Sequence, residues 1–280
     1  MGMPVSSEYL QELISRAFGD FMQEGFLVTI ADALLIGANS IAELLHNWSR
    51  VLHRIQENNL TLSAPKTEIC PKRTVVLGWS WCGGTLSPNV HKLSPLAAAT
   101  PPKTCTAMKS FIGAYKALSR CIPRYASLLS PLEDSIKGLE KTQVIQWTDE
   151  LNDHFGKAQQ ALKSPSVLTI PKPSDKLVLT VDASPLNKGL GATLFVNREG
   201  DQLPAGFYSF KMKDHQQGWY PCEHEALAIA SGVHHFAPYA RESTDPMLVL
   251  TDSKPCAELT IVCVKVNSQL PQEYPPSCPF

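Results

Sequence analysis

The sequence predicts an α+β protein of about two domains. Its 280 residues suffice for two domains of roughly 100 to 200 residues, and 44% apolar with 18% charged residues can fill ordinary hydrophobic cores. Apolar residues at helical spacing alternate with short apolar runs interrupted by Gly and Pro, which indicates helices and strands in one chain. The order βββαβ in the last third favours a mixed sheet with a helix packed on it.

The first segment is expected to form an α+β unit. Apolar residues every three to four positions predict its helices, and short apolar runs predict its strands. The helices are expected over residues 6–25 and 41–58, and the strands over residues 26–30, 34–37, 74–81 and 85–86. The turn between the first two strands places the carboxylate of Asp32 at a hairpin tip.

The middle of the chain is predicted to be helical. Residues 95–104, which include Pro101-Pro102, have the composition of a linker, and Pro171-Lys172-Pro173 marks a second boundary. Helices are expected over residues 108–118, from residue 130 onward, and over residues 149–163.

The final segment supplies the βββαβ order. Its strands are expected over residues 177–181, 190–196, 205–210 and 247–250, and its helix over residues 223–236. Ala226, Ala230 and Val233 recur at i, i+4 and i+7, so this face of the helix is predicted to pack on the sheet.

Positive charge is concentrated in one stretch although the net charge of the chain is only −1. Between residues 65 and 125 there are nine Lys and Arg residues and a single acid, Glu68. Such a concentration is typical of a surface that binds a polyanion, and its alternative is a solvated basic face without a partner. The nine candidates for nucleic-acid binding are Lys66, Lys72, Arg73, Lys92, Lys103, Lys109, Lys116, Arg120 and Arg124.

The sequence excludes several other classes. The longest apolar stretch, near residues 30–36, is broken by Asp32 and falls short of the ~20 residues that cross a bilayer, so no membrane span is expected. The first residues lack the features of a secretory signal, which favours a cytoplasmic or nuclear location and argues against secretion. Eight cysteines without a C-x-x-C pair indicate reduced thiols.

Three acidic residues lie at element ends of the last segment. Asp182 ends its first strand, Glu225 lies in its helix, and Asp252 follows its last strand. Carboxylates that meet at a sheet edge can hold hard cations such as Mg²⁺ or Mn²⁺, which activate water for phosphodiester cleavage. Aspartates also commonly cap strand ends for structural reasons alone, so their positions leave both readings open.

Three motifs around these acids resemble the RNase H-like domain of retrotransposon polyproteins. They are Thr180-Val181-Asp182-Ala183-Ser184 followed by Gly189-x-Gly191, then Tyr220-Pro221-Cys222-Glu223-His224-Glu225, then Leu250-Thr251-Asp252-Ser253. Upstream, Phe111-Ile112-Gly113 and Trp147-Thr148 resemble the region between reverse transcriptase and RNase H in gypsy-like and related long-terminal-repeat elements.

The resemblance implies a fold, a function and a partner. It implies a partial reverse transcriptase palm at residues 1–95, a helical thumb and connection at 96–170, and an RNase H-like mixed-sheet α/β domain at 171–280. The implied substrate is an RNA/DNA hybrid or duplex, with Asp182, Glu225 and Asp252 as catalytic residues and ligands of Mg²⁺ or Mn²⁺. The missing part of the polyprotein is a candidate partner. The alternative is a non-catalytic nucleic-acid-binding remnant of a retroelement.

Both implied active sites depart from the family pattern. The family's palm turn reads Tyr-x-Asp-Asp, whereas Ile30-Ala31-Asp32-Ala33 keeps one carboxylate, so Asp32 alone cannot hold two Mg²⁺ ions beside a nucleotide and polymerase activity is not expected. The RNase H family also has a fourth acid after the third motif. Residues 257–280 offer only Glu258 and Glu273, and neither matches.

Overall fold

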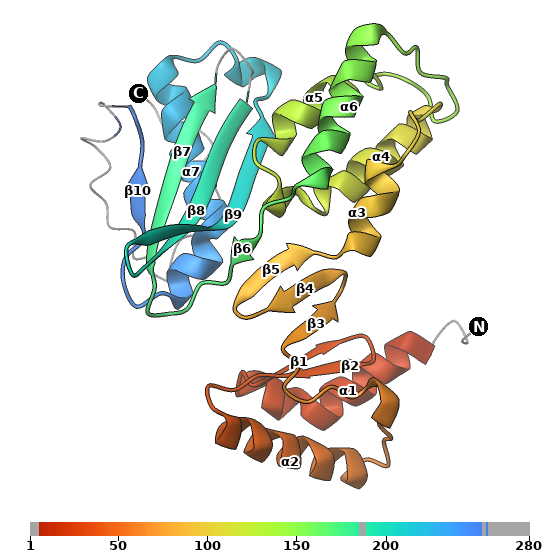
Figure 1. Ribbon diagram of the computed structural model, residues 1–280, viewed down its shortest axis with the longest axis vertical. Coiled ribbons are helices and arrows are strands. Elements are labelled where there is room, and N and C mark those ends of the chain that lie inside the picture. The colour runs from red at the N-terminus through yellow and green to blue at the C-terminus, as the bar shows by residue number, and fades with distance from the viewer. Residues whose placement is uncertain (1–5, 185–188, 254–255, 257–280) are drawn as a thin grey trace. The chain divides into compact units, whose positions relative to one another are not determined.

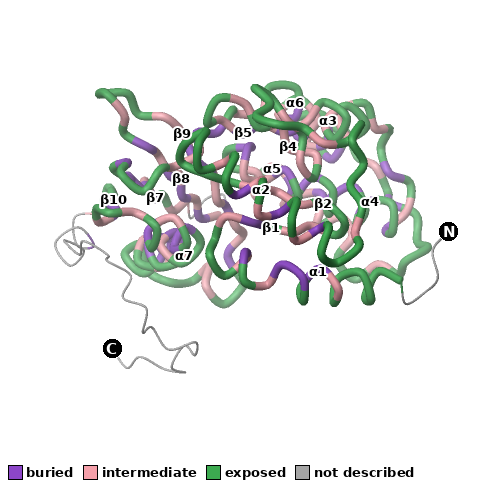
Figure 2. The backbone as a smooth tube through the Cα atoms, turned by 90° about the horizontal axis from the view of Figure 1, so that it is seen from below, coloured by how far each residue is buried: buried purple, intermediate pink, exposed green. Residues whose placement is uncertain are grey.

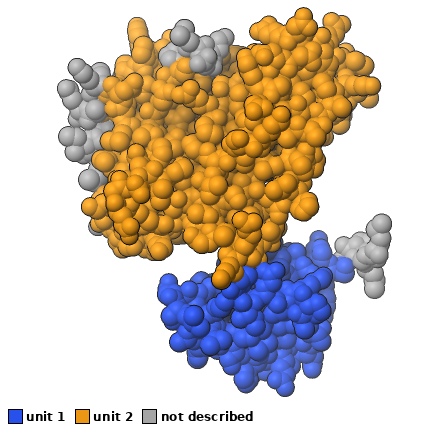
Figure 3. Space-filling model, viewed as in Figure 1, with its two compact units in different colours: residues 1–71 blue, residues 72–280 orange. Residues whose placement is uncertain are grey.

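The computed structural model describes residues 6–184, 189–253 and 256. The chain forms two compact units, residues 1–71 (unit 1) and residues 72–280 (unit 2), which Figure 3 shows in different colours. The predicted division at residues 95 and 170 stays a prediction. In the part of the chain that the structure describes, no helix combines the length and apolar character of a membrane span.

Unit 1 packs two helices against a β-hairpin. Helices α1 (Ser6–Gln23) and α2 (Ile41–Glu57) flank strands β1 (Leu27–Ile30) and β2 (Ala33–Ile36), and the 3₁₀ helix η1 (Ala64–Lys66) follows. Ile30 pairs with Ala33 across a two-residue turn, and Ala31 adopts a positive φ of 53° there. The predicted hairpin with Asp32 at its tip is therefore present. The hydrophobic core of unit 1 consists of Ile14, Ala17, Phe18, Phe21, Leu27, Val51 and Ile55.

Unit 2 begins with a four-stranded antiparallel sheet in the order β3-β4-β5-β6. Its strands are β3 (Arg73–Val76), β4 (Trp79–Cys82), β5 (Thr85–Pro88) and β6 (Leu168–Thr169). The single strand predicted over residues 74–81 is wrong, because a turn splits it into β3 and β4. Leu77 and Gly78 both have positive φ, 51° and 76°, and this two-residue turn reverses the chain between β3 and β4.

A layer of helices follows, made of α3 (Val90–Ala97), α4 (Cys105–Lys116), η2 (Ser119–Cys121), α5 (Tyr125–Asp134) and α6 (Asp149–Lys163). The hydroxyl of Thr148 accepts from the amide of Leu151 and caps α6, which spans residues 149–163 as predicted. The linker predicted from residue 95 begins too early, because Pro95 lies inside α3. Likewise α5 starts before Ser130 and contains Pro131. Both helices are short, so a proline removes few internal hydrogen bonds.

The C-terminal sheet has the order β10-β7-β8-β9 (Figure 1). Strands β7 (Lys176–Ser184), β8 (Gly189–Arg198) and β9 (Asp201–Lys211) form an antiparallel meander, and β10 (Leu248–Leu250) pairs with β7 in parallel. The parallel pair requires a crossover, which η3 (Asp214–Gln216) and α7 (Pro221–Glu242) provide. The predicted α+β class with a mixed sheet and a packed helix is confirmed.

Helix α7 covers the sheet with a face that shares only Val233 with the one predicted, since Val233 packs partly buried against the core of the sheet. Ala226 and Ala230 are exposed, whereas the buried residues of α7 are His224, Ala228, Ile229, Gly232, Phe236, Ala237 and Ala240, and Figure 2 shows how burial alternates along the backbone. Gly232 decides the orientation, since a Cβ there would lie 2.9 Å from the Cβ of Ala192 on β8. The closest approach of helix and sheet thus needs glycine.

Candidate active site

The parallel pairing of β10 with β7 brings Asp182 and Asp252 to one edge of the sheet. Leu250 is level with Thr180 in the register. Each aspartate lies two residues beyond this pair, Asp182 still inside β7 and Asp252 after β10, so the two aspartates lie at the same edge of the sheet. Both aspartates are exposed.

Glu225 reaches this edge from the second turn of α7. Its Oε1 accepts a hydrogen bond from the amide of Ala183 on β7 at 3.2 Å, and its Oε2 accepts one from the hydroxyl of Thr251 after β10 at 3.4 Å. Glu225 is in phase with the sheet-facing residues Ile229, Gly232 and Phe236, which explains why its side chain points to the sheet. The carboxylate therefore lies beside both strand ends that carry the aspartates.

Electrostatics agree with this geometry. Burial raises the pKa of Glu225 above its ordinary value, and the negative charges of Asp252 and then Asp182 raise it further, while the hydrogen bonds from Ala183 and Thr251 oppose the shift. Like charges repel over several ångströms, so the two aspartates can raise the pKa of Glu225 without being within hydrogen-bonding distance of it. The three carboxylates share one electrostatic environment.

The three carboxylates are widely spaced. Among the described residues, no three Asp, Glu, His or Cys side chains are close enough to hold a metal ion by themselves. Mg²⁺ nevertheless fits the all-oxygen donor set, because it commonly uses only one or two carboxylates and completes its shell with water and substrate phosphates.

Asp32, the remaining acid predicted to be catalytic, lies elsewhere. It is exposed at the tip of the β1–β2 hairpin of unit 1, where its neighbours in the turn are Ala31 and Ala33. Its position offers no second carboxylate from the turn itself.

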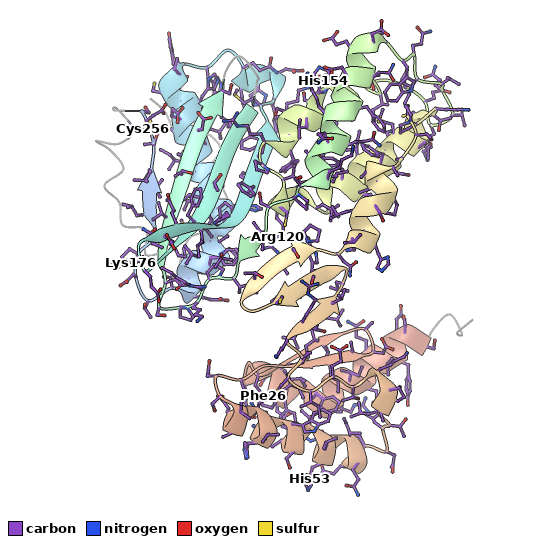
Figure 4. The ribbon with its side chains drawn as sticks, in the orientation of Figure 1. Phe26, His53, Arg120, His154, Lys176 and Cys256 are labelled. Atoms are coloured by element: carbon purple, nitrogen blue, oxygen red, sulfur yellow. The ribbon has the colours of Figure 1, made fainter. Side chains whose placement is uncertain are left out.

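Eight of the nine predicted phosphate-binding residues are exposed, and Arg120 is half-buried. Lys116 pairs with Glu133 at 2.6 Å. Arg120, labelled in Figure 4, donates to the hydroxyl of Tyr239 and lies 5.8 Å from the ring centroid of Trp79. These two cations already have partners within unit 2.

Sequence reasoning missed Thr251. His224 is buried and its Nε2 lies 2.7 Å from the carbonyl oxygen of Gln216, which makes it a packing histidine that holds the loop before α7. Thr251 stood inside a quoted motif, yet nothing in the sequence showed that its hydroxyl reaches Glu225. Glu258 and Glu273 lie outside the described residues.

Comparisons with known proteins fit this site. Residues 147–247 match the family model described as the RNase H-like domain found in reverse transcriptase. This part of the chain is similar to that domain. The match includes the strand with Asp182 and the helix with Glu225.

Most of the chain is also similar to retrotransposon polyproteins. It is 26% identical over 254 residues to the Transposon Tf2-7 and Tf2-3 polyproteins of Schizosaccharomyces pombe, covering 90% of this chain and 19% of each polyprotein. The chain thus spans about a fifth of these relatives. The resemblance to the reverse transcriptase and RNase H region of retrotransposon polyproteins is confirmed.

Solved structures share its fold. The foamy viral protease-reverse transcriptase in complex with dsDNA has a TM-score of 0.73 at 17% identity, covering 94% of this chain and 53% of that one. The same viral protein in complex with RNA/DNA hybrid has a TM-score of 0.70 at 14% identity, covering 96% and 40%.

Proposed function

We propose that this chain is the reverse transcriptase and RNase H-like part of a retrotransposon polyprotein, that it acts on RNA/DNA hybrid, and that its polymerase site is degenerate. The observation that carries the proposal is the position of Glu225 at the sheet edge of Asp182 and Asp252, where it is hydrogen-bonded to Ala183 on β7 and to Thr251 after β10. The likeness to a viral enzyme solved with dsDNA and with RNA/DNA hybrid supports the substrate class.

In this proposal the exposed acids and the partly buried acid have different roles. Asp182 and Asp252 are open to solvent and can approach a metal ion together with a substrate phosphate, whereas Glu225 is held by two hydrogen bonds and completes the donor set. Bound Mg²⁺ or Mn²⁺ would supply activation of water and stabilisation of the leaving oxygen.

Phosphate binding is proposed for the basic residues of the segment 65–125. Lys72, Arg73, Lys103 and Lys109 are exposed, and within the described residues no ion pair engages them. Long cationic side chains that extend into solvent track a phosphate backbone without reading its sequence. The rest of a longer polyprotein is a candidate partner, since the relatives extend far beyond the matched region.

Metal-dependent hybrid cleavage tests the proposal. Wild type should cleave an RNA/DNA hybrid in Mn²⁺ or Mg²⁺, and the metal should stabilise the fold by about 2.7 kcal/mol at a hundredfold excess over Kd. Asp182→Asn should abolish both effects. Asp201→Asn is the matched control. Asp201 lies opposite Arg198 in the strand register, at the turn of the β8–β9 hairpin, which is the end of the sheet away from Asp182.

The alternative, a non-catalytic nucleic-acid-binding remnant, is favoured by the openness of the acid cluster in the described residues. It predicts salt-dependent hybrid binding without cleavage and melting that no divalent metal changes. Cleavage that Asp182→Asn removes would exclude it.

A further inference from the structure

The hydroxyl of Thr251 links two parts of the candidate site. It donates to Oε2 of Glu225 at 3.4 Å and accepts from the amide of Ser253 at 3.2 Å. The first bond reaches helix α7, and the second spans the turn that contains Asp252. One hydroxyl thus uses a donor and an acceptor function to join two acids that come from different elements.

We propose that Thr251 is a positioning residue, whose hydroxyl fixes Glu225 relative to the turn of Asp252 and thereby sets the metal affinity of the site. This inference rests on the function proposed above. Thr251 contacts no reacting atom in it and acts only through Glu225 and the Asp252 turn. Partners of this kind typically change metal affinity about 10- to 100-fold when they are removed.

Two features of the site make this hydroxyl the link that matters. The other bond to Glu225 comes from the main-chain amide of Ala183, which ties the carboxylate to β7 but not to β10. Pairing between β10 and β7 ends at Leu250, so Asp252 lies beyond the last paired residue. Within the described residues, the two hydrogen bonds of the Thr251 hydroxyl connect the turn that contains Asp252 to Glu225 on α7.

The neighbouring Thr180 provides a matched control. It pairs with Leu250 in the same sheet, and its hydroxyl donates to the carbonyl oxygen of Thr193 at 3.4 Å instead of to a carboxylate. Both threonines are half-buried, so replacement by valine removes one hydroxyl of equal burial at each position.

The experiment compares Thr251→Val, Thr251→Ser and Thr180→Val with wild type in the full chain. Mn²⁺ affinity measured by electron paramagnetic resonance should fall about 10-fold in Thr251→Val. It should stay near wild type in Thr251→Ser, which keeps the hydroxyl, and in Thr180→Val. In hybrid cleavage, Thr251→Val should demand more metal while KM for the hybrid stays unchanged.

Amide exchange of Ser253, measured without metal, separates failure of this inference from failure of the proposed function. Faster exchange in Thr251→Val, restored by Thr251→Ser, supports the link even if wild type proves unable to bind Mn²⁺, in which case the metal-dependent function fails. Unchanged Ser253 exchange in Thr251→Val overturns the inference. Unchanged Mn²⁺ affinity in that variant, with wild type binding the metal, also overturns it and leaves the proposed function standing.

Discussion

Gly232 fixes how closely α7 packs on the sheet, and Gly232→Ala is the sharpest test of that packing. An added Cβ would lie 2.9 Å from the Cβ of Ala192, 3.3 Å from Cγ1 of Val181 and 3.4 Å from Cδ2 of Leu179. Carbon atoms in good contact are about 3.5 to 4.0 Å apart, so the helix has to move by roughly 0.6 Å or more.

Two opposing effects set the magnitude. Alanine is favoured over glycine in a helix interior by about 1 kcal/mol, whereas overpacking a well-packed core costs about 1 to 3 kcal/mol. The nearest atom is a rigid Cβ, so the cost should prevail and Gly232→Ala should lower the free energy of unfolding by about 1 kcal/mol. The same displacement should disturb Glu225, whose hydrogen bonds of 3.2 and 3.4 Å are already long.

Urea denaturation followed by circular dichroism measures this effect. Gly156→Ala in α6 is the matched control, because no atom lies within 4 Å of a Cβ there, and it should raise the free energy of unfolding by about 1 kcal/mol. If Gly232→Ala stabilised the protein as much as Gly156→Ala does, the argument that glycine sets the helix–sheet distance would be refuted.

Three further outcomes are expected. Purified protein should incorporate no nucleotide in a template-dependent primer-extension assay, and Ala33→Asp alone should not restore incorporation, because the resemblance implies a site of three metal-binding carboxylates and the repaired turn would supply only two. The logarithm of duplex affinity should fall with log salt by about 0.9 per phosphate contact, and Lys109→Ala should reduce this slope by about 1, whereas Lys116→Ala should reduce it less because Lys116 pairs with Glu133. Hydrogen bonds from Arg198 hold the pKa of Asp175 below its ordinary 3.8, so this stabilisation is present above that pH and is lost as pH falls through the lowered pKa.

Each of these outcomes has a contradicting result. Mg²⁺-dependent primer extension would refute the first, and a binding constant independent of salt would refute the second. For the third, Arg198→Met should cost about 3 kcal/mol at neutral pH, because it leaves the buried carboxylate of Asp175 without its partner. Lys157→Met is its control, since solvent screens the exposed pair with Asp153 and its loss should change stability little, and equal losses in both variants would contradict the argument.

Local signals predicted the elements of the C-terminal domain well. The strand around Leu177 to Val181 and the helix after Thr148 follow from an apolar run and from apolar residues at helical spacing, which depend on near neighbours in the sequence. The motifs around Asp182, Glu225 and Asp252 predicted which residues to examine. Their convergence on one edge follows from the parallel pairing of β10, a contact between distant segments.

The errors arose where non-local packing or backbone geometry decides. Ala226 and Ala230 are compatible with either a buried or an exposed helix face, so their spacing could not show that Gly232 faces the sheet. The split of residues 74–81 occurs at Leu77 and Gly78; Gly78 is a turn signal that the strand prediction did not use, whereas Leu77 is a residue that seldom adopts positive φ. A threonine hydroxyl can hydrogen-bond to solvent or to another side chain, and the sequence around Thr251 does not show which. Only the fold shows that it donates to Glu225.

The parallel pairing of β10 also bears on the order of folding. Asp182 and Asp252 are 70 positions apart, and the rest of the meander and the crossover helix lie between them in the chain. Closing so long a loop is entropically costly and slow compared with forming the hairpins of the meander. The acid cluster therefore assembles late, and a nascent or proteolytically shortened chain that lacks β10 would fold its meander yet have no place for the third carboxylate.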